Sequence, residues 1–336
     1  MLNTNRNLLF KAIILALCTI SFVHVFLFPL YELKNRRGAA RTFSDLEQSL
    51  CMSNIKKRGV WRSGRCPQYG VVSVVQGGRL GNQMWEYASV WALARRTGLE
   101  PYVPRCIRTK LDQVFEHLTV STFEEIGHCP MQMEHFVRSL DAWNFTNQSI
   151  ILPRYYVQPE LVLTWVQDIV QEFTMRKKLV ARSQEVLQAV VKATEKEYPK
   201  NITPTFVGVH VRRTDYIGYL RIKHHVGPAH RRFFLAAMKI FEEKYEGVVF
   251  VVVSDDPVWC WKTFLAKNNA YVVGWHQKNS PALDMAILAA CNHTIYDYGT
   301  FGEWGAILAG GDTIYYNVSS HSSAKLGQLM ANWHTI

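Results

Sequence analysis

Short apolar runs recur along the chain, and each ends in glycine or polar residues. They occupy Val71–Val75, Phe206–Val211, Val248–Val253 and Thr294–Tyr298. Short runs of this kind, rich in β-branched residues, are typical of buried strands in parallel sheets. Segments with helical spacing of their apolar residues lie between them, and this alternation predicts an α/β fold with parallel sheets.

Two of the intervening segments are predicted to be helices with defined ends. The first covers Met84–Arg96, with Asn82 as its expected N-cap and Gly98 as its stop. The second covers Asp168–Tyr198 and ends at Pro199, because proline cannot continue a helix.

The apolar stretch Ala12–Leu30 is about long enough to cross a bilayer. No cleavage site of the Ala-x-Ala kind directly follows it, so we expect a retained anchor and not a cleaved signal peptide. A polar stem and two α/β domains follow, with a hinge expected at 201–204. The expected divisions are a cytoplasmic tail, a transmembrane signal-anchor, a stem, an N-terminal domain and a C-terminal domain, over residues 1–11, 12–30, 31–68, 69–204 and 205–336.

The two signals for the orientation of the anchor disagree. Basic residues gather after the apolar stretch, and the positive-inside rule would then place the body in the cytosol. These residues are Lys34, Arg36, Arg37 and Arg41. Glycosylation sequons, which matter only in a secretory lumen, begin at Asn144, Asn147, Asn201, Asn292 and Asn317. We give the sequons more weight and expect a lumenal body.

Cysteine usage supports an oxidising compartment, because an even number lies outside the expected anchor. The six are Cys51, Cys66, Cys106, Cys129, Cys260 and Cys291. Pairing cannot be derived from sequence; the near-neighbour choices are Cys51–Cys66 and Cys106–Cys129. Buried free thiols are the alternative.

The formal net charge of +11 favours an anionic ligand or surface. A nucleic-acid partner is disfavoured, because basic residues are not interleaved with stacking aromatic residues in one stripe. The chain has 336 residues, 48% of them hydrophobic, which is enough for two domains with real cores.

The strand Phe206–Val211 leads directly into Arg212 and Arg213. Open α/β sheets bind ligands beyond the carboxyl ends of their strands, and guanidinium groups bind phosphate in a bidentate manner. The pair therefore predicts a phosphate site. A surface ion pair between Arg213 and Asp215 is the alternative for this motif taken alone.

Three further blocks place glycine or polar residues after an apolar strand. They are Gly77–Gln83, Ser254–Pro257 and Gly299–Gly302, the last followed by Gly310 and Gly311. The first lacks the Gly-Lys-Ser/Thr ending of a P-loop, which excludes that kind of ATPase. Together with His210–Arg213, the four blocks resemble, in order over roughly residues 70–318, the alpha-1,2-fucosyltransferase family.

The resemblance implies two Rossmann-like domains facing a cleft, the GT-B architecture. It implies transfer of fucose with inversion from GDP-fucose to the 2-hydroxyl of a galactose-terminated glycan, without a metal, by a single-pass type II protein of the Golgi membrane. The C-terminal domain would bind the donor and the N-terminal domain the acceptor. Two departures, Thr214 and Glu303, leave other linkages open, including the core alpha-1,6 linkage. The alternative that is not an enzyme is a membrane-anchored binding protein that has lost catalytic turnover.

On this resemblance, Arg212 holds the donor diphosphate and stabilises the leaving group, with Arg213 and His210 beside it. A packed histidine is the equal alternative for His210. Asn82 would orient the acceptor or the sugar, because an amide cannot act as an ordinary base. The donor-binding set is completed by Asp255, Asp256, Thr300, Phe301 and Gly302.

Asp255 and Asp256 are expected to accept hydrogen bonds from a guanine edge or ribose hydroxyls, one of them being structural. Carboxylate pairs also bind magnesium, but these two are adjacent, whereas metal-dependent sugar transferases typically carry Asp-x-Asp. The general base is left unassigned between Asp215 and Glu86, and a mechanism with little base assistance stays open.

Overall fold

The computed structural model describes residues 42–53, 64–131, 136–137, 149–194, 203–274, 279–318 and 322–336. The expected tail and anchor, most of the stem, and the sequons at Asn144, Asn147 and Asn201 lie outside this range. Within it, none of the helices has the length and apolar character needed to span a membrane.

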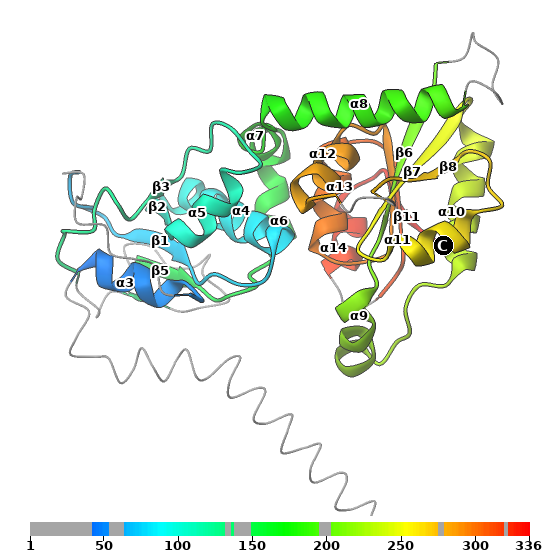
Figure 1. The fold of residues 1–336 in the computed structure, drawn as a ribbon. Coiled ribbons are helices and arrows are strands. Elements are labelled where there is room, and N and C mark those ends of the chain that lie inside the picture. The colour runs from blue at the N-terminus through cyan, green and yellow to red at the C-terminus, as the bar shows by residue number, and fades with distance from the viewer. Residues whose placement is uncertain are drawn as a thin grey trace, which may run out of the picture.

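Two parallel sheets form the two halves of the molecule (Figure 1). The first has the order β3-β2-β1-β5-β4, with strands β1 Val71–Val74, β2 Glu100–Val103, β3 Ser121–Thr122, β4 Phe136–Val137 and β5 Ser149–Leu152. The second has the order β11-β10-β9-β6-β7-β8, with strands β6 Thr205–Val211, β7 Val248–Ser254, β8 Ala270–Val272, β9 His293–Tyr296, β10 Thr313–Tyr315 and β11 Trp333–Thr335. The predicted α/β class with parallel sheets is confirmed.

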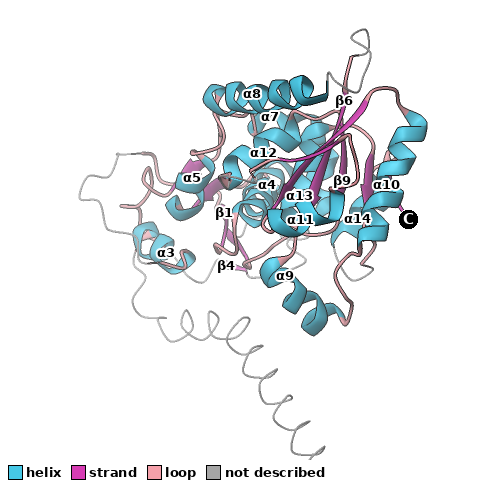
Figure 2. Cartoon of the chain, turned by 45° about the vertical axis from the view of Figure 1, so that its right-hand side comes forward, coloured by secondary structure: helices cyan, strands magenta, loops and turns pink. Residues whose placement is uncertain are grey.

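Helices cover both faces of the second sheet (Figure 2). Those before β6 are α3 Phe43–Leu50, α4 Leu80–Thr97, α5 Arg105–Leu111, α6 Pro159–Val162, η4 Leu163–Trp165, α7 Val166–Glu172 and α8 Lys177–Thr194. Those after it are α9 Thr214–Tyr219, η5 Leu220–His224, α10 Arg231–Lys244, α11 Pro257–Phe264, α12 Pro281–Ala289, α13 Thr300–Ala309 and α14 Ser322–Leu329.

Strand β7 shows why this sheet is buried on both sides. Its seven residues are all buried, and alternate side chains point to opposite faces of a strand. Phe250 packs in one apolar cluster with Phe234 of α10, whereas Val251 packs in another with Leu288 of α12. An uninterrupted apolar run is therefore required here.

The expected long helix over 168–198 is wrong, because the chain breaks between α7 and α8. Phe173 at the break is buried and packs its ring 4.9 Å from that of Phe115 and 4.8 Å from that of Trp304. Arg176 then donates its backbone N–H to the carbonyl of Val114 at 2.9 Å. Tertiary packing thus overrides the continuous helical pattern, and α8 goes on to pack against α12 of the second half.

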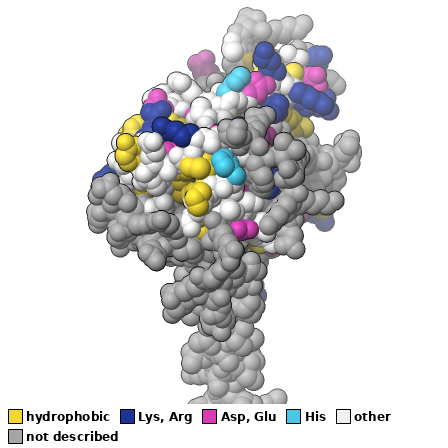
Figure 3. Space-filling model, turned by 90° about the vertical axis from the view of Figure 1, so that its left-hand side faces the viewer, with side chains coloured by type: hydrophobic (Ala, Val, Ile, Leu, Met, Phe, Trp, Pro, Cys, Tyr) yellow, Lys and Arg dark blue, Asp and Glu magenta, His cyan; other side chains and the backbone are white. Residues whose placement is uncertain are grey.

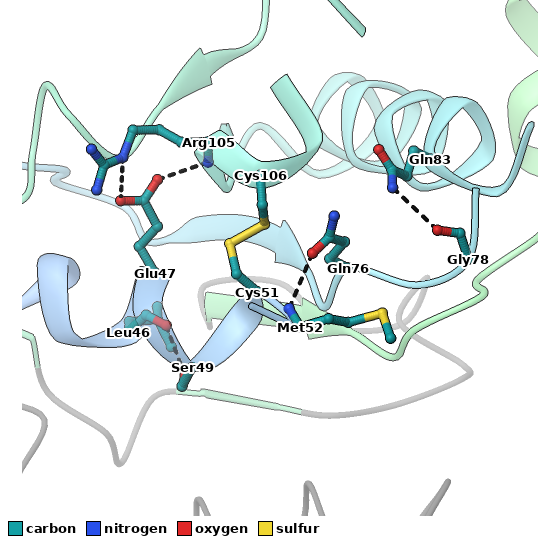
Figure 4. Close-up of a disulfide and its surroundings, with 10 residues drawn as sticks. All are labelled: Leu46, Glu47, Ser49, Cys51, Met52, Gln76, Gly78, Gln83, Arg105 and Cys106. Atoms are coloured by element: carbon teal, nitrogen blue, oxygen red, sulfur yellow. Dashed lines mark hydrogen bonds and ion pairs between the residues drawn. A yellow bond between two sulfur atoms is a disulfide. The ribbon is translucent and has the colours of Figure 1, made fainter. Parts of the chain in front are cut away.

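The near-neighbour disulfide pairing is also wrong. Cys51 pairs with Cys106, and Cys66 with Cys129, at Cα–Cα distances of 6.0 and 5.7 Å. The first bridge joins the end of α3 to α5, next to the ion pair of Glu47 with Arg105 (Figure 4). The folded arrangement of these helices, not the spacing along the chain, selects the partners. Free thiols remain at Cys260 and Cys291, both buried.

Candidate functional site

The four sequence blocks converge at the carboxyl edge of the second sheet. Strand β6 pairs with β7 through Val211 and Ser254, and with β9 through His210 and Tyr296. Because parallel strands end at the same edge, the residues that follow these three strands lie side by side. Helices α4 and α13 present their first turns to this edge.

Arg212 is held by three carboxylates. Its Nη1 lies 2.5 Å from Oδ2 of Asp255, its Nη2 pairs with Asp215, and its backbone N–H donates to Oδ2 of Asp297 at 2.8 Å. The guanidinium has five N–H donors, so three remain for a ligand. The arginine is fixed in orientation without being saturated.

Arg213 does not form the surface ion pair with Asp215 that the motif taken alone allowed. Its guanidinium lies 4.0 Å from the ring centre of Trp259, and its Nε is 3.6 Å from Oδ2 of Asp256. That Nε is buried and has no hydrogen-bond partner among the described residues. Asp215 pairs instead with Arg212 and with Arg79.

The two adjacent aspartates have different structural roles. Asp255 accepts hydrogen bonds from the Arg213 backbone N–H at 2.8 Å and from the hydroxyl of Thr214, besides its bond to Arg212. Asp256 caps α11, with Oδ1 accepting from the backbone N–H of Trp259 at 3.1 Å. Asp256 is thus a helix cap, and Asp255 organises the arginines. Thr214 contributes to the same network.

His210 is a buried histidine inside β6, with 5% of its surface exposed. Burial, assisted by the charge of Arg212, lowers its pKa to about 4, so the ring is neutral near pH 7. It packs against Phe301 with the ring centres 5.3 Å apart. A Cβ on Gly302 would lie 2.9 Å from its Nδ1, so this close approach requires glycine.

Asp297 is a site residue that the sequence analysis missed. It follows β9 directly, is 1% exposed, and accepts the backbone N–H of Arg212 and that of Tyr298. Burial raises its pKa well above the ordinary value. The sequence did carry a signal for Asp297, because this acidic residue directly follows an apolar strand, as the polar residues of the other blocks do.

The first turns of α4 and α13 meet across the two halves. The hydroxyl of Thr300 donates to Oδ1 of Asn82 at 3.2 Å. A Cβ on Gly81 would lie 2.6 Å from the backbone nitrogen of Phe301, so the two backbones approach too closely for any other residue. Asn82 is not the N-cap of α4, as expected from sequence, because Arg79 occupies that position. The predicted stop is confirmed, since Gly98 ends the helix at φ 75°.

The comparisons with known proteins decide the family. The family described as Glycosyl transferase family 11 matches residues 60–335. The chain belongs to glycosyl transferase family 11. It is 34% identical over 258 residues to galactoside 2-alpha-L-fucosyltransferase Sec1 of Mus musculus, covering 74% of this chain and 67% of the relative. It is 32% identical over 314 residues to galactoside alpha-(1,2)-fucosyltransferase 2 of Mus musculus, covering 84% of this chain and 82% of the relative.

Among solved structures, the fold is similar to POFUT1 crystallised with GDP, with 11% identity, a TM-score of 0.46, and coverage of 76% of this chain and 100% of the other. The fucosyltransferase NodZ from Bradyrhizobium matches with 14% identity and a TM-score of 0.43, over 71% of this chain and 92% of the other. Membership of family 11 confirms the resemblance to alpha-1,2-fucosyltransferases that the four sequence blocks indicated.

Glu303 is a packing residue. Its side chain is completely buried, accepts from Nε1 of Trp85 at 2.9 Å, and bonds the hydroxyls of Ser322 and Ser323. It therefore links α13 to α4 and α14 away from open solvent.

The two carboxylates considered for general base differ in access. Burial acts to raise the pKa of Asp215, but Arg212 and Arg79 outweigh it and the pKa falls below its ordinary value. Asp215 is exposed but is consequently a weak base. Glu86 is fully buried, its Oε1 accepts from the backbone N–H of Tyr155 at 2.9 Å, and burial raises its pKa to about 8. Neither combines basicity with access.

Proposed function

We propose that this protein is a galactoside alpha-1,2-fucosyltransferase that uses GDP-fucose as its donor. The observation that carries the proposal is the 34% identity to galactoside 2-alpha-L-fucosyltransferase Sec1, over 74% of this chain. Family membership extends from residue 60 to residue 335 and includes all four site blocks. The two parallel sheets would act as the two halves of a GT-B-like enzyme.

The donor diphosphate would bind at the carboxyl edge of the second sheet. Arg212 retains free N–H donors, and the buried Nε of Arg213 has no hydrogen-bond partner among the described residues. Thr300 and Gly302, in the first turn of α13, add backbone N–H groups, since a helix N-terminus attracts anions. The polar atoms here suit an anion with several oxygens.

The reaction would break the bond between fucose C1 and the β-phosphate oxygen while the galactose O2 bonds to C1 from the opposite face. A β-linked donor thereby gives an α-linked product, and the electron pair of the broken bond leaves with GDP. Arg212 would stabilise this developing negative charge. The hydroxyl proton would pass to water, because Asp215 and Glu86 both lack the combination of access and basicity.

Asn82 would orient the sugar or the acceptor from the first half of the molecule. Its Oδ1 lies at the junction of α4 with α13, where Thr300 donates to it. His210 would support the site by packing on Phe301, without titrating near neutral pH.

No metal is proposed in the reaction, because the positive charge of Arg212 and the α13 N-terminus would perform the role that a divalent cation has in other sugar transferases. Asp255 and Asp256 are already engaged, by the arginines and by the cap of α11.

We propose a lumenal body behind a single-pass anchor in the Golgi membrane, with residues 69–204 on the acceptor side and 205–336 on the donor side.

The test is the linkage of the product. The full chain should transfer fucose from GDP-fucose to lactose or N-acetyllactosamine, and methylation analysis should place it on the galactose 2-hydroxyl. Fucose on the innermost N-acetylglucosamine or on a serine hydroxyl would replace this linkage by one of the alternatives left open. Binding of GDP without any transfer would identify a relative that has lost turnover.

A further inference from the structure

The segment between Asp215 and Glu242 contains no acidic residue, although it is rich in cations. Four of these cations are exposed side chains without an ion pair among the described residues. They are Arg221, Lys223, Arg231 and Arg232, which we call the cationic segment.

The distribution of charge elsewhere is different. On the outer face of the first half, basic side chains lie beside acidic ones (Figure 3). Several exposed cations elsewhere in the described structure, such as Arg95 and Arg182, pair with a neighbouring carboxylate. Exposed cations without an ion pair among the described residues also occur on α8, at Lys177 and Lys178, but this helix lies at the opposite end of the second sheet from α9. The distinguishing property of the cationic segment is therefore unpaired charge of one sign beside the site, which favours an anionic partner there.

The cationic segment flanks the site. Helix α9 begins directly after Arg213 and projects from the carboxyl edge of the second sheet (Figure 1). Tyr216 of α9 stacks on Tyr298 with the ring centres 4.8 Å apart. Arg221 follows Arg213 by eight residues, a rise of about 12 Å along the helix, which is about one and a half Debye lengths at physiological salt.

The start of α10 returns to the same edge. Phe233 in its first turn contacts Tyr316 at 5.2 Å between ring centres, and Tyr316 contacts Tyr298 at 6.5 Å. Arg231 and Arg232 lie in this first turn, where the helix dipole is already positive. This is an unfavourable place for cations unless they act on an anion outside the fold.

The site itself has no excess of positive charge with which to attract an anion from a distance. Three arginines face four carboxylates there: Arg79, Arg212 and Arg213 against Asp215, Asp255, Asp256 and Asp297. The raised pKa of Asp297 removes at most one of the negative charges. Short-range contacts can hold a diphosphate, but the long-range potential must come from outside the site.

We propose that the cationic segment is an electrostatic guide that draws the dianionic nucleoside diphosphate sugar toward the cleft. The inference rests on the proposed function, since it takes the donor to be a nucleotide sugar. A charged rim of this kind raises association rates about 10- to 1,000-fold, and the gain falls steeply with ionic strength. The guide acts on the approach of the donor, so it leaves the dissociation rate of the bound nucleotide unchanged.

The experiment removes the four charges together, as Arg221→Gln, Lys223→Gln, Arg231→Gln and Arg232→Gln. Stopped-flow fluorescence with N-methylanthraniloyl-GDP measures association and dissociation of the full chain at about 20 mM and about 500 mM salt. We expect association to slow at least about tenfold at low salt and less than about twofold at high salt. The dissociation rate and the kcat with uncharged lactose should stay within about twofold of wild type.

A matched control removes four exposed cations elsewhere, Lys110, Lys177, Lys178 and Lys192. Three of them lie on α8, which runs along the opposite end of the second sheet from α9 (Figure 1). This variant has the same net charge and should associate like wild type at both salt concentrations. Equal slowing in both variants would reduce the effect to net charge and overturn the guide.

Two further outcomes would also overturn it: faster dissociation from the first variant, or a loss that persists at high salt, since either shows direct contact with the nucleotide. The proposed function fails separately. If wild type neither binds the GDP probe nor transfers fucose, the donor assignment is wrong. If wild type does both and the first variant associates equally fast, only the guide is wrong.

Discussion

Thr300 donates a hydrogen bond of 3.2 Å to Asn82 from the other half of the molecule. The bond joins the first turn of α13 to the first turn of α4, at the edge where the site arginines lie. Two groups that the sequence separates by more than half of the chain thus become neighbours at the proposed reaction centre.

This bond separates a structural role of Asn82 from a role toward the sugar. Thr300→Val should lose the bond and cost about 0.5–1.5 kcal/mol in the free energy of unfolding. Asn82→Ala loses the same bond, and it should lower kcat at least about tenfold more than Thr300→Val if the amide also orients the sugar. Equal kcat values for the two variants would limit Asn82 to holding α13.

Arg212→Lys should lower kcat/KM at least about 100-fold, because lysine keeps the charge but loses the planar fork. Its melting temperature should stay near that of wild type, provided that the ammonium group keeps one of the carboxylate contacts. Arg182→Lys, at an exposed ion pair with Glu185 on α8, is the matched control and should be fully active. Near-normal turnover of Arg212→Lys would remove this arginine from the leaving-group role.

Transfer should survive prolonged treatment with EDTA, because the proposed leaving-group charge is balanced by Arg212 and α13. The measurement is turnover before and after chelation, followed by addition of manganese or magnesium. A loss of turnover that either ion restores would revive the metal interpretation of Asp255 and Asp256.

Glu86 predicts a pH dependence of stability. Its pKa is raised from 4.5 to about 8 in the folded protein by burial, so the folded state holds this proton more tightly than the unfolded state. The corresponding stability is complete below pH about 4.5 and is lost as the pH rises through about 8. Glu86→Gln keeps an oxygen for Tyr155 and cannot ionise, so its melting temperature should fall less than that of wild type between pH 5 and pH 9.

The control for this prediction is Glu185→Gln, an exposed residue on α8. Its melting curve should follow that of wild type over the same pH range. A wild-type curve parallel to that of Glu86→Gln would show that this carboxyl does not titrate in the folded protein between those pH values.

Glycosylation tests the compartment. The asparagines Asn292 and Asn317 are both exposed, but the side chain of Asn292 already accepts the Phe206 backbone N–H at 2.8 Å, and Asn317 lies just after β10. We expect a glycan at Asn317, seen as a mobility shift that endoglycosidase removes and that Asn317→Gln reduces. A body without glycans that is open to protease in intact microsomes would place it in the cytosol.

The sequence by itself determined four of the strands, β1, β6, β7 and β9, and the polar residues that follow them. Local physics suffices for that: an apolar β-branched run such as Val248–Val253 can be satisfied only between two layers, and a polar residue placed after it must leave the sheet at its carboxyl edge. Parallel pairing of β6 with β7 and β9 then brings the residues after these strands to one edge, so their convergence could be predicted before any contact was known.

Tertiary structure alone decided the partners. The pairing of Cys51 with Cys106 depends on how α3 lies against α5, and the break between α7 and α8 depends on the burial of Phe173 against Trp304. Likewise, Asp215 takes Arg79 from the other half of the molecule as a partner, not its near neighbour Arg213. Each outcome depends on surfaces that meet only after folding, and no spacing along the chain records which surfaces those are.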